Sequence, residues 1–273
     1  MTFSITGKTA IVTGAAHGIG LAIARHFVDR GANVMFADVD EEALARELGE
    51  AARGEGPVRY FAGDLRQRLT IANLVSATID AFDRVDILVN ASRHVALSDP
   101  LEPEDDAVEE MLQQNLLTAL RLSQHVARRM IAQAARPDGD AAGGAEQAGA
   151  IVNISSIAAQ RTQPELMGYS VACAAVDQMT RALALALAPK RIRVNAVAFG
   201  SVMSASLQRG LKEHGDFRAE ILRRTPLGRI AAAVELAEAA QFLASDAAGF
   251  VTGQILTVDG GRTLLDPAVA PAH

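Results

Sequence analysis

The sequence predicts an α/β protein in which helices cover both faces of one doubly wound parallel sheet of about seven strands. Three observations lead to this prediction. Short apolar runs alternate with longer helix-forming segments along the whole chain. The first apolar run, residues 10–12, turns sharply into a helical pattern through Gly14, Gly18 and Gly20. Asp38 ends the second run, about twenty residues after these glycines. Together these features are typical of a Rossmann-like domain.

The first half of the chain shows the alternation of strands and helices most clearly. Gly31 is expected to stop the first helix, because glycine readily takes the left-handed conformation found at helix ends. A Gly56-Pro57 pair follows the second helix. The run at 85–90 is apolar almost throughout, as expected for a strand buried on both faces. The expected strands here are 8–13, 33–38, 58–62 and 85–90, and the expected helices are 18–30, 41–53 and 70–83.

The second half of the chain continues the same pattern. Asn115 lies inside its first helix, at a position where asparagine is unfavourable. Pro189 ends the long alanine- and leucine-rich helix that precedes the sixth strand. Residues 134–149 are small, polar and rich in helix breakers, which predicts a surface loop inserted before a core strand. The expected strands are 151–155, 192–197 and 254–258, and the expected helices are 104–134, 166–188, 207–222 and 234–244.

Composition favours a single domain over residues 1–273. A chain of 273 residues supports one large α/β core. Its net charge of −6 argues against a nucleic-acid partner. The single cysteine rules out an internal disulfide and fits a reducing compartment, so we expect a cytoplasmic location. We find no secretory signal and no apolar run long enough to span a bilayer, and we expect neither a membrane partner nor a metal site.

The glycine-rich turn has the properties of a phosphate-binding site. Gly14 permits the tight turn, while Gly18 and Gly20 leave no side chain between backbone and ligand, or between helix and sheet. The helix that begins there points free N–H groups and the positive end of its dipole out of the sheet edge. A pyrophosphate is the natural occupant. Taken alone, the motif is also compatible with an ordinary glycine-rich turn between a strand and a helix.

The order of several motifs resembles the short-chain dehydrogenase/reductase family over essentially the whole chain. Several motifs in the right order are more specific than one. The resemblance implies an enzyme that transfers a hydride between a nicotinamide dinucleotide and a secondary alcohol or ketone. The matching signatures are Thr13-Gly14-x-x-x-Gly18-Ile19-Gly20, Asp64, Asn90, Asn115, Ser156, Tyr169, Ile192-Arg193-Val194-Asn195 and Val258-Asp259-Gly260-Gly261.

The resemblance also implies which cofactor is used and which residues hold it. Asp38 stands where NAD-using members carry an acid that binds the ribose hydroxyls and repels a 2′-phosphate, so NAD is expected and NADP less so. NADP-using relatives carry a basic residue at the position of His17, which is mostly neutral at pH 7. The implied cofactor-binding residues are Gly14, His17, Gly18, Ile19, Gly20, Asp38, Asp64, Leu65, Asn90, Ala91, Ser92, Tyr169, Cys173, Gly200, Val202 and Ser204.

The reaction centre that the resemblance implies contains Ser156, Tyr169 and Asn115. In the family the tyrosine transfers a proton, the serine holds the substrate oxygen, and the asparagine holds a water of a proton relay. A lysine four residues after the tyrosine contacts the nicotinamide ribose and lowers the tyrosine pKa by its charge. This chain has Cys173 at that position. A neutral thiol supplies no positive charge, and we interpret Cys173 as a small buried side chain rather than a reactive thiol.

Three cations are candidates to replace the lysine: Arg93, Arg161 and Lys212. Arg93 stands where the family has a glycine, and its side chain either contacts cofactor or substrate or points outward. Phe199 stands where relatives have a proline, and we expect it to shift the nicotinamide end of the cofactor. The resemblance further implies that residues 203–224 form a lid over the substrate.

Two functions follow from these residues. The first is an NAD(H)-dependent oxidoreductase acting on a small-molecule secondary alcohol or ketone. The second is a catalytically impaired, dinucleotide-binding homologue that acts as a sensor or structural subunit. The phosphate loop and Tyr169 favour the first, whereas Cys173, Arg93 and Phe199 favour the second because all three departures lie at the nicotinamide end. The resemblance also implies a homodimer or homotetramer assembled through the long helices and the last strand.

Overall fold

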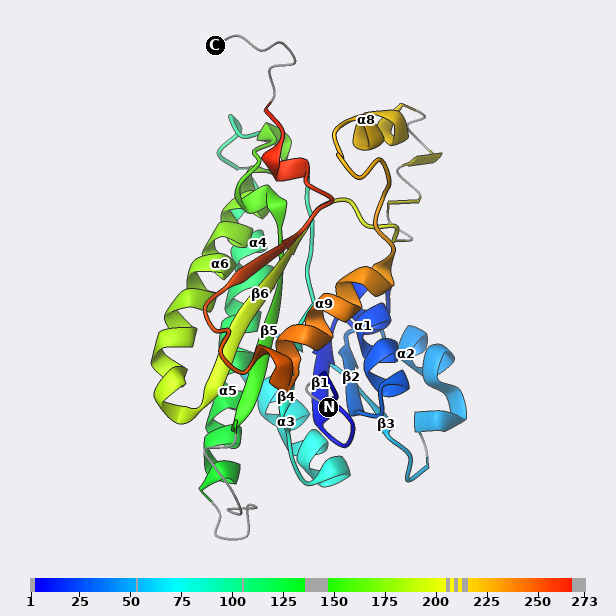
Figure 1. The fold of residues 1–273 in the computed structure, drawn as a ribbon, viewed down its shortest axis with the longest axis vertical. Coiled ribbons are helices and arrows are strands. Elements are labelled where there is room, and N and C mark those ends of the chain that lie inside the picture. Colours follow the sequence, from blue (N-terminus) through cyan, green and yellow to red (C-terminus); the bar gives the residue numbers. More distant parts are fainter. Residues whose placement is uncertain are drawn as a thin grey trace.

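One parallel sheet of seven strands forms the centre of the molecule. The computed structural model describes residues 3–52, 54–104, 106–135, 147–204, 207–208, 211–212 and 216–266. The strands lie in the order β3-β2-β1-β4-β5-β6-β7, and all neighbours run parallel (Figure 1). This confirms the predicted fold class. The strands are β1 (Thr9–Thr13), β2 (Asn33–Asp38), β3 (Val58–Ala62), β4 (Ile87–Asn90), β5 (Gly149–Ser156), β6 (Ile192–Phe199) and β7 (Ile255–Val258).

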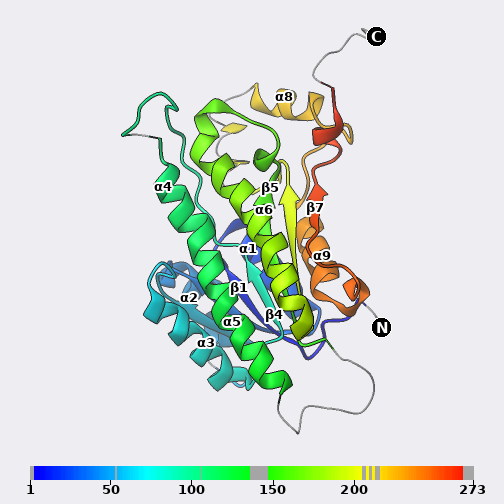
Figure 2. The ribbon, with the colours of Figure 1, turned by 90° about the vertical axis from the view of Figure 1, so that its left-hand side faces the viewer.

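Helices cover both faces of this sheet, as Figures 1 and 2 show. One face carries α1 (Gly18–Asp29), α2 (Glu41–Leu48) and α9 (Ala233–Ala244). The other carries α3 (Arg68–Phe82), α5 (Thr118–Ala134) and α6 (Met167–Leu187). Two further helices are α4 (Val108–Met111), which precedes α5, and α8 (Phe217–Arg223), which lies beyond the carboxyl ends of the strands (Figure 2).

Alternating side chains of each strand explain why both faces are covered. Within β1, Ala10 and Val12 pack against the layer of α1 and α9, whereas Ile11 packs against the layer of α3, α5 and α6. Successive side chains of a strand point to opposite faces, so an apolar run has to be buried on both. These core residues are almost inaccessible to solvent. The continuous apolar runs of the sequence therefore become the central strands.

The region predicted as one helix over 104–134 differs from that expectation. Helix α4 begins only at Val108, after Ala107 takes a left-handed backbone conformation with φ of 53°. A π-helical turn at Leu112–Leu117 then separates α4 from α5, and Asn115 lies inside it. The Asn115 side chain forms two hydrogen bonds with the backbone of His94, which lies outside the helix, and the regular pattern changes at this residue.

Two central strands extend further than predicted. The sequence predicted 151–155 and 192–197, whereas β5 is Gly149–Ser156 and β6 is Ile192–Phe199. The extension brings Ser156 of β5 into register with Phe199 of β6 at the carboxyl edge of the sheet. A prediction that identifies strands by runs of aliphatic residues misses polar or aromatic residues at the end of a strand.

Parts of two predicted segments lie outside the described residues. For the predicted loop 134–149 these are residues 136–146, and for the predicted lid 203–224 they are 205–206, 209–210 and 213–215. Within the predicted lid, residues 207–208 and 211–212 are helical. Helix α8 covers Phe217–Arg223, which overlaps the end of the helix expected over 207–222.

Helix α6 and its flanking turns form the longest apolar helical segment. Among the described residues, Pro164–Lys190 is long and apolar enough to cross a membrane by length and composition alone. Part of this helix, including Ala184 and Leu183, packs into the core beneath the sheet. A core helix of an α/β domain passes the same length test.

Candidate active site

The predicted site residues gather at one edge of the sheet. Gly14 follows β1, while Asp38 ends β2, Asn90 ends β4 and Ser156 ends β5. Because the strands are parallel, their carboxyl ends meet along the same edge, where open α/β sheets bind ligands. Two pockets lie there. The first, beside β1 and β2, includes Asp38 and Asp64, and the second includes Tyr169.

The glycine turn is built from close backbone contacts. Gly14 has a left-handed backbone with φ of +65°, and a Cβ there would lie 2.8 Å from Cα of Ser92. A Cβ on Gly20 would lie 2.1 Å from the carbonyl oxygen of Gly14, so only glycine lets α1 approach the turn this closely. Gly18 has φ of +54° and no atom within 4 Å of its Cβ position.

The start of α1 is open to a ligand. Its N-cap residue, His17, makes no side-chain hydrogen bond to the first turn. The N–H groups of Gly18, Ile19 and Gly20 lie at the amino end of the helix, where no residue four places earlier belongs to it. His17 instead contacts Asp40 at 2.9 Å. These groups fit an anion, because the helix dipole and the free N–H groups act in the same direction.

Asp38 is fixed by backbone N–H groups. One carboxylate oxygen accepts from Ala16 at 3.0 Å, and the other accepts from Val39 at 2.7 Å and from Asp40 at 3.2 Å. A carboxylate has about four acceptor positions, so it retains capacity for a further donor. Its side chain lines the first pocket, at the end of the strand that neighbours the glycine turn.

Asp64 and Leu65 also line that pocket. Leu65 is buried in the core beneath the sheet. Asp64 accepts hydrogen bonds from the Arg66 guanidinium at 2.9 Å, and these bonds hold the pKa of the Asp64 carboxyl below its usual range. The sequence did not single out Arg66, which also lines this pocket and brings a positive charge to it.

A hydrogen-bonded chain of side chains fixes the end of β4. Asn90 donates to Ser123 at 2.9 Å and to Asn153 at 2.8 Å, and Asn153 donates to Thr180 at 2.8 Å. Sequence reasoning found Asn90 but missed the other three members of this chain, Ser123, Asn153 and Thr180. All three are buried polar residues within otherwise apolar or helical segments. A polar residue in such a segment needs a hydrogen-bond partner, and this requirement could have identified them.

The segment after β4 is held from two sides. The Thr13 hydroxyl accepts the backbone N–H groups of Ala91 and Ser92, each at 3.0 Å. The Asn115 side chain accepts from the N–H of His94 at 2.7 Å and donates to its carbonyl at 2.9 Å. The π-helical turn therefore places Asn115 against the chain on the far side of Arg93, which lies between these two attachments.

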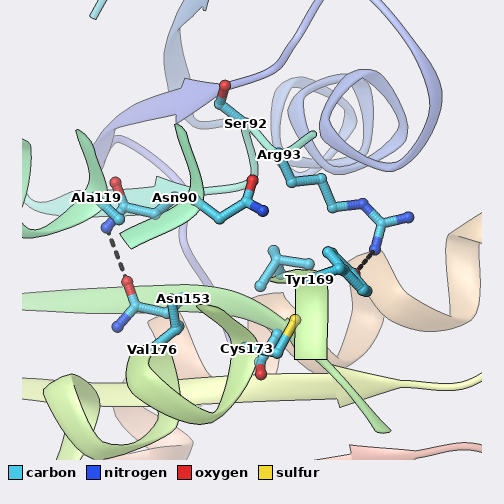
Figure 3. A pocket seen from close by; sticks show the side chains of 11 residues that line it. Asn90, Ser92, Arg93, Ala119, Asn153, Tyr169, Cys173 and Val176 are labelled. Carbon is cyan, nitrogen blue, oxygen red and sulfur yellow. Dashed lines mark hydrogen bonds between the residues drawn. The ribbon is translucent and has the colours of Figure 1, made fainter. Parts of the chain in front are cut away.

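Tyr169 and Cys173 line the second pocket together with Ser155, and Ser156 lies close to both side chains although it does not line that pocket. Tyr169 and Cys173 lie on adjacent turns of α6, and both are buried. The Ser156 hydroxyl, at the end of β5, accepts the N–H of Ala158 at 3.2 Å. Arg93 reaches in from the segment after β4 and donates from Nη1 to the Tyr169 hydroxyl at 2.8 Å (Figure 3). The structure thus unites the predicted serine and tyrosine with one of the three candidate cations.

Burial controls the protonation of this cluster. It raises the pKa of Tyr169 to about 12, although the charge of Arg93 and the Ser156 hydroxyl act in the opposite direction. Burial also raises the pKa of Cys173 to about 11. Both groups are therefore protonated near pH 7. A protonated thiol is a poor nucleophile, which agrees with the interpretation of Cys173 as a buried, unreactive side chain.

The other two candidate cations, Arg161 and Lys212, are exposed. The remaining lysines also lie elsewhere: Lys8 pairs with Asp246 at 2.6 Å, and Lys190 follows α6 at the amino end of β6. Among the described residues, no group of three or more histidine, cysteine or acidic side chains is placed to hold a metal ion.

The segment after β6 closes the edge of the site. A Cβ on Gly200 would lie 3.1 Å from the Asp259 side chain, so β6 passes close to the chain after β7. Val202 is buried and pairs with Ala231 in a short bridge. Ser204 accepts the N–H of Leu207 at 3.2 Å and begins the helical part of the predicted lid. The Arg93 guanidinium lies over the ring of Phe199, with its carbon 4.3 Å from the ring centre.

Comparisons with known proteins agree with this architecture. Residues 14–263 match the family described as enoyl-(acyl carrier protein) reductase. The chain is 40% identical to cis-4-hydroxycyclohexanecarboxylate dehydrogenase of Sinomonas cyclohexanicum, covering 94% of this chain and 96% of that protein.

Two solved structures are similar over almost their full lengths. A gluconate 5-dehydrogenase from Burkholderia cenocepacia, in complex with NADP and tartrate, is 30% identical with a TM-score of 0.84, covering 97% of this chain and 98% of that one. A 7α-hydroxysteroid dehydrogenase complexed with NADH and 7-oxo glycochenodeoxycholic acid is 31% identical with a TM-score of 0.82, covering 95% and 96%.

Proposed function

Because this chain belongs to the short-chain dehydrogenase/reductase family, we propose that it is an NAD(H)-dependent oxidoreductase that interconverts a secondary alcohol and a ketone. The observation that carries the proposal is the pairing of two sites at one sheet edge. An uncapped helix start with a glycine turn lies beside β1, and a buried tyrosine with a serine lies beside β5.

The residues present fit a dinucleotide. The open space at Gly18 and the free N–H groups of Ile19 and Gly20 suit the pyrophosphate. The pocket of Asp38, Asp64 and Leu65 suits the adenosine half. We assign the nicotinamide half to the segment of Asn90, Ala91 and Ser92, to Tyr169 and Cys173, and to Gly200, Val202 and Ser204. His17 lies at the rim of the phosphate site, where it pairs with Asp40.

NAD is the proposed cofactor rather than NADP. Asp38 carries negative charge at the end of β2, where it would accept hydrogen bonds from ribose hydroxyls and repel a 2′-phosphate. Its backbone hydrogen bonds hold the carboxylate in place for this role. Arg66 is the nearest counter-argument, since a guanidinium binds phosphate well, but its charge is already paired with Asp64.

The chemistry divides between cofactor and protein. When bound, the oxidised dinucleotide accepts the hydride that leaves the alcohol carbon. Tyr169 exchanges the proton of the substrate oxygen, so it acts as acid when a ketone is reduced and as base when an alcohol is oxidised. The Ser156 hydroxyl donates to the same oxygen and fixes its position. Asn115 positions the segment after β4 through its two bonds to His94.

Cys173 occupies the place of the family's lysine in this proposal. Its thiol, protonated near pH 7, supplies neither a positive charge nor a strong hydrogen-bond donor. The expected consequence is a slower reaction than with lysine. The competing function, a dinucleotide-binding homologue impaired in catalysis, makes the opposite prediction that no substrate turns over.

The substrate we propose is a small alcohol or ketone. Relatives named for dehydrogenation of a hydroxycyclohexanecarboxylate and of a hydroxysteroid support this class. We further propose that residues 203–224 cover the substrate, that the chain works in the cytoplasm, and that it forms a homodimer or homotetramer. Apolar side chains exposed on α6, Val171 and Leu185, support a contact between subunits there.

A titration with both cofactors tests the proposed function. NAD and NADH should bind the purified protein more tightly than NADP and NADPH, and one member of a panel of secondary alcohols and ketones should turn over. The Cys173→Lys variant serves as a comparison. Binding without turnover in wild type, together with turnover in Cys173→Lys, would instead support the impaired homologue.

A further inference from the structure

Tyr169 needs a cation for the reaction proposed above, because its hydroxyl is buried and its ionised form is costly. Only 5% of the residue is exposed, and burial raises its pKa to about 12. A nearby positive charge favours the phenolate and eases proton transfer in both directions. None of the three lysines lies beside it: Lys8 is paired with Asp246, Lys190 follows α6, and Lys212 is exposed.

We propose that Arg93 is the cation partner of Tyr169, and that Phe199 holds its guanidinium in place. This inference rests on the proposed function. Arg93 donates from Nη1 to the Tyr169 hydroxyl at 2.8 Å. Its guanidinium carbon lies 4.3 Å from the centre of the Phe199 ring and 6.0 Å from that of the Tyr169 ring. Two residues that depart from the family pattern are thus in contact with each other.

The backbone of Arg93 is attached on both sides, so its side chain starts from a defined position. Thr13 accepts the N–H groups of the two residues before it, and Asn115 binds the N–H and carbonyl of the residue after it. A long side chain loses conformational entropy when it is held, and a fixed backbone reduces that cost. The ring of Phe199 adds a cation–π contact that holds the guanidinium in place.

The charged and titratable groups that face Tyr169 are few. Arg93 approaches from the segment after β4, Cys173 lies one turn further along α6, and the Ser156 hydroxyl lies at the end of β5. Of the other charged residues nearby, His94 and Glu110 pair with each other at 3.6 Å. Asp177, a further turn along α6, is buried and protonates more readily than usual because burial raises its pKa. Arg93 is therefore the positive charge that acts on the phenol.

Arginine differs from lysine in a way that affects the reaction. A guanidinium stays charged at every pH that the protein tolerates, whereas a buried lysine can lose its proton. The charge on Arg93 comes from the segment after β4 and not from α6. Below the pKa of Cys173, the pH dependence of the reaction should therefore follow Tyr169 without a second ionisation from its cation partner.

The test measures the ionisation of Tyr169 directly. The chain contains two tyrosines, Tyr60 and Tyr169, and no tryptophan. In a Tyr60→Phe background, Tyr169 is the sole tyrosine, so biosynthetic replacement by a ring-fluorinated tyrosine labels one site. Ring fluorination makes the phenol more acidic, which brings its titration down toward the range where proteins remain folded. Fluorine NMR then follows the midpoint of ionisation without cofactor or substrate.

Arg93→Met should raise this midpoint by about one unit or more, because a positive charge beside the phenol is lost. Arg93→Lys keeps the charge and should stay nearer to the parent. Phe199→Leu should cause a smaller rise in the same direction. Adding Cys173→Lys to Arg93→Met should lower the midpoint again, because an ammonium would then lie one helical turn from Tyr169.

Arg161→Met is the matched control, since Arg161 is an exposed arginine, and it should leave the midpoint unchanged. An unchanged midpoint in folded Arg93→Met would overturn the proposal. If that variant does not fold, Arg93→Gln carries the same expectation and the same contradicting outcome. Because the titration requires no turnover, a failure of the oxidoreductase assay leaves this result readable, and the proposed function can stand while the role of Arg93 falls.

Discussion

Tyr169 is the residue whose protonation most directly controls the proposed reaction. Burial favours its neutral form and outweighs the charge of Arg93, so the pKa rises to about 12. Below that value the phenolate fraction grows tenfold with each pH unit, while the neutral fraction stays close to one. At neutral pH the protonated form of Tyr169, which acts as the acid, is therefore abundant, whereas the phenolate, which acts as the base, is rare.

The first prediction concerns pH dependence. The kcat/KM for alcohol oxidation, which reports the free enzyme, should rise about tenfold per unit from about pH 6 to about pH 9. The kcat/KM for ketone reduction should stay nearly constant, because protonated Tyr169 dominates throughout this pH range. Initial rates in both directions measure this, with protein stability checked at each pH. A plateau of oxidation below pH 9 would contradict the raised pKa of Tyr169.

Asp38 leads to a prediction about cofactor choice. Asp38→Asn removes the negative charge and one strong acceptor but nearly preserves shape. Hydrogen bonds to charged groups contribute about 1.5–3 kcal/mol, so the preference for NAD over NADP should fall roughly tenfold to a hundredfold. The ratio of kcat/KM for the two cofactors measures it. Glu42→Gln, an exposed acid in the first turn of α2, is the control and should leave the ratio unchanged. An unaltered ratio in Asp38→Asn would remove Asp38 from cofactor selection.

Individual residues also show which features of the site could be predicted from the sequence and which could not. Glycines and strand-end polar residues could be predicted, since their roles follow from backbone geometry at one edge of a sheet. The direction of the Arg93 side chain could not be predicted from the sequence. Its segment is positioned by Thr13 and Asn115, which are distant in sequence from it and from each other. Only the fold brings these attachments together, so the sequence left the side chain of Arg93 with two alternatives.

At the scale of elements, α1 approaches β1 through the glycine turn. A Cβ on Gly20 would lie 2.1 Å from the Gly14 carbonyl oxygen, far inside a normal contact. Gly20→Ala should therefore push the helix away from the strand, lowering the free energy of unfolding by about 1–3 kcal/mol or more and weakening dinucleotide binding. Denaturant unfolding and cofactor titration measure the two effects.

Gly54→Ala is the control for this prediction, because no atom lies within 4 Å of its Cβ position. It should change stability by less than about 0.5 kcal/mol. If Gly20→Ala proves equally harmless, the close approach of α1 to the turn does not matter for folding or binding.

Most elements could be predicted because their periodicity and their breakers agree. The helix expected at 104–134 is the instructive exception. Most of its residues are helix formers, but Asp106, whose carboxylate accepts the N–H of Val108, and Asn115 are not, and the helix begins only at Val108. The π-helical turn at Asn115 depends on two hydrogen bonds to His94, a contact between separate segments. Tertiary contacts of this kind override propensity, which acts only as a weak preference.

At the scale of the whole molecule, the parallel sheet makes one edge the place where all strands end. The glycine turn, Asp38, Asn90 and Ser156 come from four different strands or their ends, and the strand order places them side by side. Helices on both faces leave this edge uncovered by the layers themselves (Figures 1 and 2). The fold class therefore predicts the location of the site before any side chain is considered.

A bound dinucleotide should stabilise the entire domain, because it connects the ends of several strands. A ligand at a hundred times its Kd contributes about 2.7 kcal/mol. For a chain of this size, that corresponds to a rise in Tm of roughly 5–10 °C. Thermal unfolding with and without NAD measures it, and NADP at equal concentration should give a smaller rise. Equal shifts with both cofactors would contradict the proposed preference for NAD.

The most direct test of the proposed function compares wild type with Tyr169→Phe in one assay, the formation of NADH from NAD and a panel of secondary alcohols. The account predicts NADH formation by wild type with at least one alcohol. Tyr169→Phe should still bind NAD, with at most a modest loss of affinity from the missing hydroxyl at the nicotinamide half, yet lose about 10²- to 10⁴-fold in kcat, because the proton has no acceptor. Equal rates from the two proteins, or no NADH from wild type that demonstrably binds NAD, would contradict the claim that Tyr169 drives an NAD-dependent oxidation.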